Sequence, residues 1–193
     1  MRRRSARIYI AGPDVFAPHW EAFREELGAY ARTRGITPLF PSSHPGDGPR
    51  AIYVGNTALI RQADGVLANL QCFRGSEPDS GTVFEVGFAV ALGRPVWGFP
   101  AGGSYHEKVA ARVGLHHSGG SCAVCQEGYA IEDFGKPLNL MLAIPVRLCN
   151  TWWEALDEIQ AATTVAAYVQ EGDSHGKRRP RPKDTFWGAS EDP

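Results

Sequence analysis

Short apolar runs that alternate with helical periodicity constrain the fold of the first hundred residues more than any other feature. The four runs are Arg7–Ala11, Ile36–Phe40, Gly65–Asn69 and Arg94–Phe99. Between them, residues 19–34, 51–63 and 82–92 have the apolar spacing and the glycine stops of amphipathic helices. Repeated strand–helix–strand units predict an open, mainly parallel sheet flanked by helices, which is a three-layer Rossmann- or flavodoxin-like α/β fold.

The domain organisation follows from length and from changes in pattern along the chain. The 193 residues suit a single α/β domain, expected over residues 1–170. Between 100 and 135 the periodicity weakens among glycines and serines, which predicts an irregular insertion or a lid. An amphipathic helix is predicted over 151–169, followed by a mobile basic and polar tail over 171–193.

Charge and hydropathy exclude several classes of partner. Lys plus Arg is 20 and Asp plus Glu is 21, so no overall basic field favours nucleic acid or a membrane surface. No apolar run approaches the roughly 20 residues of a membrane span, and Ile8–Ala11 is too short for the core of a signal peptide. We therefore expect a soluble, cytoplasmic protein. The basic stretch Lys177–Lys183 is interpreted as solvated, with contact to phosphate or nucleic acid as the alternative.

Four cysteines raise the question of a metal site. They are Cys72, Cys122, Cys125 and Cys149, and without a secretion signal they are expected to be reduced. Cys122 and Cys125 have the C-x-x-C spacing of a zinc or redox pair, with His116 and His117 nearby. The simpler interpretation is a surface loop that carries two thiols, so we predict neither a metal nor an organic cofactor.

The segment that most suggests chemistry runs from Glu77 to Ala89. Asp79 and Glu85 bracket a glycine turn, and Glu85 is expected one turn into a helix, where the helix dipole favours an ionised carboxylate. Such a carboxylate could act as a nucleophile or an electrostatic stabiliser, while Asp79 handles protons. Paired carboxylates are the usual means of cleaving a glycosidic bond. The structural alternative is that both residues only cap the helix and complement its dipole.

Other candidates follow from the expected topology, because ligands of parallel sheets bind beyond the carboxyl ends of the strands. Tyr9 lies near the end of the first strand and is either a core aromatic residue or a hydrogen-bonding partner. Asn69 ends the third strand and could line the pocket. Phe16, His19 and Trp20 follow the first strand and could stack on a base or form a helix face. Asp64 is interpreted as structural.

Five segments taken in order resemble the nucleoside 2-deoxyribosyltransferase family. They are Ile8–Pro13, Ala63–Leu70, Asp79–Ala89, Gly93–Val96 and Lys136–Met141. The resemblance covers about residues 7–145, and the combined order of segments is more specific than any one of them.

The resemblance implies roles for particular residues. Glu85 would be the nucleophile, Asp79 would contact the base and handle its proton, and Tyr9 would orient the nucleophile. Asn139 would reach the 5′-hydroxyl of a deoxyribose bound by a neighbouring subunit, with Met141 close to the same site. A homodimer or a higher homo-oligomer with shared active sites is therefore expected.

One departure from the family pattern concerns the base. Asn56 stands where the family often has a second base-contacting aspartate. Since an amide both donates and accepts hydrogen bonds and a carboxylate only accepts, base preference is open at this position. Gly12 and Gly81, together with Asn69, complete the expected substrate-binding set.

The expected activity is the transfer of a 2-deoxyribosyl group between nucleobases, through a covalent intermediate on Glu85, in nucleotide salvage. The expected partners are small molecules, a deoxynucleoside and a nucleobase. One alternative is a hydrolase of the N-glycosidic bond of nucleosides or nucleoside 5′-monophosphates. Gly81–Glu85 is also similar to the loop of phosphoribohydrolase-like proteins, but the preceding double glycine of that loop is missing. The other alternative is a nucleotide-sensing module without catalysis.

Overall fold

Five parallel strands form the main sheet of the computed structural model, which describes residues 4–41, 48–116 and 124–173. The strands are β1 (Ala6–Ala11), β2 (Ile36–Leu39), β3 (Gly65–Leu70), β4 (Val96–Pro100) and β7 (Val146–Leu148). Their order in the sheet is β2-β1-β3-β4-β7, and every neighbouring pair is parallel. The predicted parallel α/β fold is confirmed.

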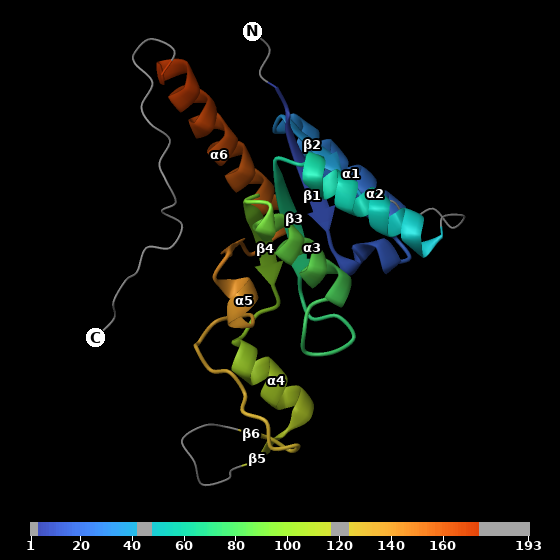
Figure 1. Ribbon diagram of the computed structural model, residues 1–193, viewed down its shortest axis with the longest axis vertical. Helices are drawn as coiled ribbons and strands as arrows, with labels where there is room; N and C mark the ends of the chain where they lie inside the picture. Colours follow the sequence, from blue (N-terminus) through green and yellow to red (C-terminus); the bar gives the residue numbers. More distant parts are fainter. Residues whose placement is uncertain (1–3, 42–47, 117–123, 174–193) are drawn as a thin grey trace. The chain divides into compact units, whose positions relative to one another are not determined.

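Helices connect the strands and follow them along the chain (Figure 1). They are α1 (Trp20–Thr33), α2 (Pro49–Gln62), α3 (Ser80–Ala91), α4 (Tyr105–Val113), α5 (Leu140–Ala143) and α6 (Trp152–Asp173), with a short 3₁₀ helix, η1 (Pro13–Phe16). The helices predicted from the spacing of apolar residues correspond to α1, α2, α3 and α6. Helix α3 begins at Ser80, two residues before the predicted start at Thr82.

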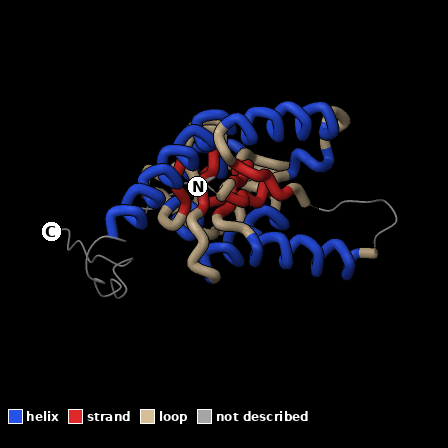
Figure 2. The backbone as a smooth tube through the Cα atoms, turned by 90° about the horizontal axis from the view of Figure 1, so that it is seen from above, coloured by secondary structure: helices blue, strands red, loops and turns tan. Residues whose placement is uncertain are grey.

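The two faces of the sheet are covered by different helices, and Figure 2 shows the strands between the two helical layers. One face packs against α2, α3 and α5, and its core includes Tyr9, Val66, Val86 and Leu142. Alternate strand residues turn to the opposite face. There the ring of Phe99 on β4 lies 4.6 Å from that of Trp152 at the start of α6, which in turn lies 5.7 Å from Phe23 on α1.

The strand order fixes where a ligand can bind. From β1 the chain moves to β2 on one side, whereas β3 lies on the other side of β1. The crevice beyond the carboxyl ends of β1 and β3 is therefore the topological switch point, the usual ligand site of an open α/β sheet. At the opposite end, Asp64 accepts hydrogen bonds from the Arg7 backbone (2.8 Å) and the Arg4 guanidinium (2.7 Å). This agrees with the structural role predicted for Asp64.

The expectation of an irregular insertion between 100 and 135 is wrong in part. The segment contains α4, whose Ser104 and Glu107 form a complete capping box. It also contains a two-stranded antiparallel sheet of β5 (Leu115–His116) and β6 (Val124–Cys125). Strand β7 and helix α5 were not predicted either, because elements of three and four residues are too short to show a periodicity.

The last helix is longer than predicted. Helix α6 continues to Asp173, so residues 171–173 are helical rather than part of a tail. The rest of the predicted tail, with the basic stretch Lys177–Lys183, lies outside the described residues. No helix within the described ranges combines the length and the apolar character that crossing a membrane requires.

Two glycines give a paired test of this packing. A Cβ at Gly98 on β4 would lie 2.8 Å from Leu70 Cδ1 and 3.0 Å from Val146 Cγ1, whereas a Cβ at Gly87 on α3 would meet nothing within 4 Å. We expect G98A to lower the free energy of unfolding by about 1–3 kcal/mol through overpacking. G87A should raise it by up to about 1 kcal/mol, because alanine is the better helix former. Urea unfolding measures both, and a G98A variant as stable as G87A would contradict the packing described.

Candidate active site

A short hydrogen bond joins strand β1 to helix α3. Tyr9 is fully buried on β1, and its hydroxyl donates to Oε1 of Glu85 over 2.6 Å. Burial and the charge of Glu85 raise the pKa of the Tyr9 hydroxyl far above its usual value, so Tyr9 remains a protonated donor. This bond engages one of the two oxygens of the carboxylate.

Opposing effects set the pKa of the half-buried Glu85. Burial raises it to about 7, because removal from water disfavours the charged form. The hydrogen bond from Tyr9 acts in the other direction, and the nearby charge of Asp79 adds to the upward shift. At neutral pH the carboxylate therefore lies close to its midpoint, where small changes in its surroundings alter its charge.

The expectation that Glu85 is ionised by the helix dipole is wrong in its cause and in its extent. Helix α3 begins at Ser80, so Glu85 is the sixth helical residue and lies beyond the first turn, where the dipole acts most strongly. Loss of hydration outweighs what remains of the dipole effect. The donor that favours the ionised form is the phenol of Tyr9 rather than the helix terminus.

Asp79 forms the N-cap of α3. Its Oδ2 accepts hydrogen bonds from the backbone nitrogen of Thr82 (2.9 Å) and from the Thr82 hydroxyl (3.1 Å). A Cβ at Gly81 would lie only 3.1 Å from the same oxygen, which explains the small residue there. The capping role considered from the sequence is therefore real, and it also holds the Asp79 carboxylate close enough to influence Glu85.

A second acidic group lies at the carboxyl ends of the central strands. Asn69 on β3 is 7% exposed, and its side-chain nitrogen donates to Oδ2 of Asp14 over 2.9 Å. A Cβ at Gly12 would lie 2.5 Å from that Asp14 oxygen and 2.9 Å from Cβ of Asn69, so only glycine fits. Gly12 and Asn69 thus position Asp14, which sequence reasoning missed although it follows the first strand directly.

The loop that carries Asp79 presents a cation on two aromatic rings. Phe16 and Phe73 stack with centroids 6.0 Å apart, and the Arg74 guanidinium lies 4.6 Å from the Phe73 ring centre and 5.5 Å from that of Phe16. Arg74 has a φ of 56°, the only positive φ among the described non-glycine residues. Strained backbone of this kind is often found at functional sites. Trp20, by contrast, is a core residue on α1.

The remaining substrate-binding candidates lie on other elements. Asn139 is the N-cap of α5, where its Oδ1 accepts from the Met141 backbone (3.0 Å) and its Nδ2 donates to Glu132 (2.8 Å). The Met141 side chain is 73% exposed. Asn56 is half-buried on α2. The contacts described for Asn139 are therefore with its own turn and with Glu132, rather than with the carboxylates of Asp79 and Glu85.

Helix α4, which was not predicted from the sequence, contacts the loop that carries Asp79. The Tyr105 hydroxyl at the start of α4 donates to Oε1 of Glu77 over 2.6 Å, on the same loop as Asp79. The Phe73 backbone nitrogen donates to the Glu77 carbonyl (2.9 Å), which closes that loop. The sequence signal that could have identified α4 is its capping box, Ser104 and Glu107.

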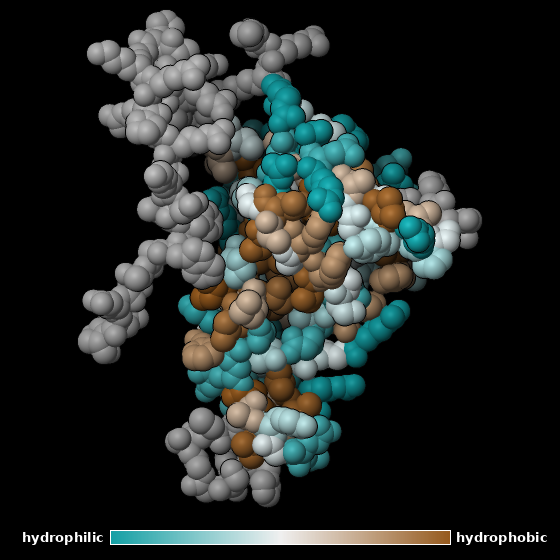
Figure 3. Space-filling model, in the orientation of Figure 1, coloured by the Kyte–Doolittle hydropathy of each residue, from teal (hydrophilic) through white to brown (hydrophobic). Residues whose placement is uncertain are grey.

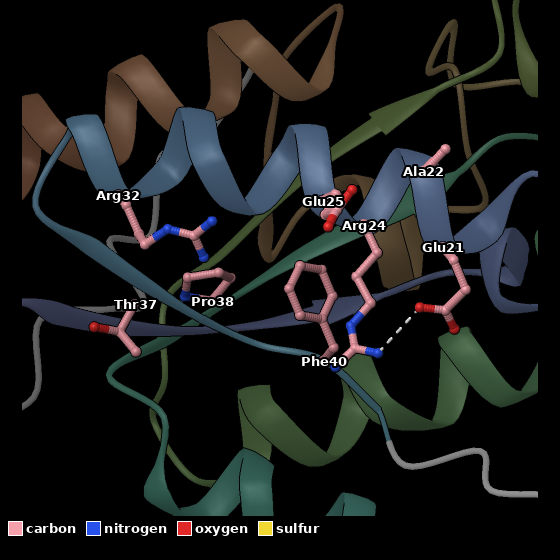
Figure 4. A pocket seen from close by; sticks show the side chains of 8 residues that line it. All are labelled: Glu21, Ala22, Arg24, Glu25, Arg32, Thr37, Pro38 and Phe40. Carbon is pink, nitrogen blue, oxygen red and sulfur yellow. Dashed lines mark hydrogen bonds and ion pairs between the residues drawn. The ribbon is translucent and has the colours of Figure 1, made fainter.

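Two open hollows lie away from the carboxylates. One, of about 670 Å³, lies between α1 and β2, and Figure 4 shows Arg24, Arg32 and Phe40 among its lining side chains. The other, of about 500 Å³, is lined by residues of α1 and by Trp153. Neither hollow is lined by Glu85 or Asp79. None of the described ion pairs involves Glu85 or Asp79.

The cysteines form no recognisable metal centre in the described ranges. Cys72, Cys125 and Cys149 are free thiols, and no group of three or more potential His, Cys, Asp or Glu ligands occurs among the described residues. Cys122 and His117 lie outside those ranges. The interpretation of the C-x-x-C pair as a surface loop therefore stays a prediction.

The fold and the site together define a class of protein. It is a parallel α/β protein in which a glutamate accepts a hydrogen bond from a buried tyrosine of β1, with the helix-capping Asp79 close by. The family model for nucleoside 2-deoxyribosyltransferase matches residues 8–141. The chain belongs to the nucleoside 2-deoxyribosyltransferase family, whose members are enzymes that act on nucleosides and nucleobases.

One solved structure agrees with this assignment, and a second shares the fold. A 2-desoxiribosyltransferase from Leishmania mexicana shares 30% sequence identity with a TM-score of 0.69, over 81% of this chain and 97% of that chain. A conserved protein from Enterococcus faecalis V583 shares 20% identity with a TM-score of 0.53, over 81% of this chain and 98% of that chain. A search of the curated proteins found no match.

The raised pKa of Glu85 predicts a pH-dependent effect on stability. Its pKa in the folded protein, about 7, lies above the unfolded value of 4.5. Between these two pH values the unfolded chain binds fewer protons than the folded protein. The free energy of unfolding therefore falls as the pH rises from 4.5 to about 7. The side chain of the E85Q variant cannot ionise, so the variant does not lose this stability as the pH rises. From pH 5 to pH 8 its free energy of unfolding should rise relative to wild type by up to about 3 kcal/mol.

Denaturant unfolding at both pH values measures this difference. E127Q is the matched control, because Glu127 is exposed in the turn after β6. Its difference from wild type should be the same at pH 5 and pH 8. An effect of E85Q on stability that is the same at both pH values would show that burial does not raise the pKa of Glu85.

Proposed function

We propose that the protein transfers a 2-deoxyribosyl group between nucleobases through a covalent intermediate on Glu85. The observation that carries the proposal is the 2.6 Å hydrogen bond from the buried Tyr9 to Glu85, with Asp79 close enough to raise the glutamate's pKa. It supports an aimed nucleophile with a second carboxylate beside it, which double displacement at an anomeric carbon requires.

In the first step, the free oxygen of Glu85 attacks C1′ of a 2′-deoxynucleoside. The N-glycosidic bond breaks, its electron pair goes to the base nitrogen, and a proton from Asp79 neutralises the departing base. The product is a deoxyribosyl ester of Glu85. In the second step, a nitrogen of another base attacks C1′, Asp79 takes the proton from that base, and Glu85 leaves. Two inversions retain the configuration at C1′.

The roles of Tyr9 and Asp79 follow from their effects on Glu85. The Tyr9 hydrogen bond lowers the pKa of Glu85 and so favours the ionised nucleophile, while it also fixes the direction of attack. Negative charge on Asp79 raises the pKa of Glu85.

The other substrate-binding assignments belong to the same proposal. Asp14, held by Asn69 at the switch point, supplies acceptor oxygens for the base or sugar, and Gly12 and Gly81 allow close approach of backbone. Asn56 on α2 contacts the base. Such an enzyme would serve in nucleotide salvage.

We propose further that two copies of the chain share their active sites. Exposed apolar side chains gather on helices α2, α3 and α5, and Figure 3 shows apolar residues over the region of α3 and α5. They include Tyr53 and Phe84, whose rings lie 5.9 Å apart, and the strongly exposed Met141. Phe84 lies on α3, the helix that also carries Glu85, so a second copy on this face would come close to the proposed site. Asn139, next to Met141, would then act in the partner's site.

A shared site can be tested by mixing two inactive variants. E85A lacks the nucleophile and N139A lacks the sugar contact, so each homodimer should be impaired. In a mixed dimer one site combines an intact Glu85 with an intact Asn139. After dissociation and reassociation, an equal mixture should regain about a quarter of wild-type activity. The base-exchange rate per chain measures this, with each variant taken alone through the same procedure as the control. No gain on mixing would show that the sites are not shared.

One observation favours a second candidate, the hydrolysis of nucleoside 5′-monophosphates. Arg74 presents a guanidinium on the Asp79 loop, held over Phe73 in a strained backbone conformation. A positioned guanidinium is well suited to bind a phosphate. If this candidate is correct, a 5′-monophosphate outcompetes the nucleoside, and water replaces the second base at C1′.

A product assay separates these functions. We expect wild type with 2′-deoxyinosine and adenine, or with thymidine and adenine, to form 2′-deoxyadenosine. Free base without 2′-deoxyadenosine would indicate a hydrolase, and no turnover of nucleosides or 5′-monophosphates would indicate a sensor. E85A and E85Q should lose activity by about a thousandfold or more, since both lack the nucleophile. Chromatography measures the products, with E127Q as the control. A largely active E85A would refute the assignment of Glu85.

A further inference from the structure

Glu132 binds the turn that carries Asn139 at two points. Its Oε2 accepts from the side-chain nitrogen of Asn139 over 2.8 Å, and its Oε1 accepts from the backbone nitrogen of Leu140 over 2.7 Å. Glu132 is half-buried, whereas its neighbour Asp133 is exposed. Glu132 lies seven residues before Asn139, in the segment between β6 and α5. Neither the sequence motifs nor the family resemblance indicated a role for it.

These contacts define which way round the amide of Asn139 lies. A carboxylate only accepts hydrogen bonds, so Glu132 selects the nitrogen side of the amide. On the other side, Oδ1 of Asn139 accepts from the Met141 backbone nitrogen over 3.0 Å. Each contact would become repulsive if the amide were inverted. One N–H and one lone pair of Asn139 are left in defined directions to meet a ligand.

We propose that Glu132 is a positioning residue that sets the orientation in which Asn139 presents its amide to the substrate's sugar. The inference rests on the proposed function, in which Asn139 contacts the 5′-hydroxyl. It adds a residue that acts only through Asn139, without touching the substrate.

The backbone of this turn is held by several contacts besides the one from Leu140 to Glu132. The Tyr105 backbone nitrogen donates to the Lys136 carbonyl over 2.7 Å, and the Lys108 ammonium donates to the carbonyls of Pro137 and Ala101. Leu138 is 2% exposed and belongs to the core beneath α5. Loss of the Glu132 carboxylate should therefore release the Asn139 side chain while the turn stays in place, which distinguishes positioning from a general structural role.

The E132Q substitution tests this with little change of shape. The new amide turns its NH₂ group toward one of the two donors, Asn139 Nδ2 or the Leu140 backbone, and so favours inversion or release of the Asn139 amide. For a 2′-deoxynucleoside we expect kcat/KM to fall by about tenfold, the order expected for one lost hydrogen bond. For a 2′,5′-dideoxynucleoside, which lacks the 5′-hydroxyl, it should not change.

Two comparisons complete the experiment. Glu127 is an exposed carboxylate in the same segment between β6 and α5, so E127Q should leave kcat/KM unchanged for both substrates. The E132Q/N139A double variant should be no slower than N139A alone, because Glu132 acts only through Asn139. Equal losses on both substrates, no loss on either, or additive losses in the double variant would overturn the proposal.

A binding measurement keeps this result separate from that of the proposed function. In an E85A background, calorimetry compares the affinities of the 2′-deoxynucleoside and the 2′,5′-dideoxynucleoside with and without E132Q. A selective loss of affinity for the 5′-hydroxylated ligand supports the role of Glu132 even if wild type proves to transfer nothing. An E132Q substitution that leaves both affinities unchanged refutes it even if wild type exchanges bases.

Discussion

The hydrogen bond between Tyr9 and Glu85 is the interaction on which the site depends. A glutamate on the inner side of α3 loses hydration, and that loss raises its pKa to about 7. The phenol of the fully buried Tyr9 on β1 supplies the one short donor, at 2.6 Å, that opposes this shift. The result is a carboxylate close to its ionisation midpoint, which combines reactivity with a cost in stability, a trade-off common at active sites.

The strand order explains why these particular residues meet. Tyr9 lies on β1, and the Asp79 loop follows β3, which pairs with β1 at the switch point. At the same point Asn69 of β3 reaches across to Asp14, which follows β1. Both contacts join segments more than 50 residues apart in the chain. Parallel pairing of β1 with β3 brings them together, so the chemistry of the site depends on the topology rather than on any one motif.

Much of this arrangement could be predicted from the sequence, and the failures have physical reasons. The first four strands and the helices α1, α2, α3 and α6 were predicted because their apolar residues follow one period and glycines mark several of their ends. The bond between Tyr9 and Glu85 was expected from the family resemblance, not from the residues themselves. The charge of Glu85 was misjudged, because the dipole could be assessed from position in a helix whereas burial depends on packing between distant elements.

The segment between β4 and β7 was predicted least well from the sequence. Its contacts indicate that it supports the site rather than only adding to the surface. Tyr105 at the start of α4 bonds Glu77 on the Asp79 loop, and Glu132 near its end bonds the Asn139 turn. Burial raises the pKa of the Tyr105 hydroxyl, and the charges of Glu77 and Glu132 add to the shift, so all three groups lie close together. One segment thus contacts the loop that carries the proposed proton donor and the turn that carries the proposed sugar contact. The segment therefore supports both parts of the proposed site through different residues, although none of these residues needs to touch a substrate.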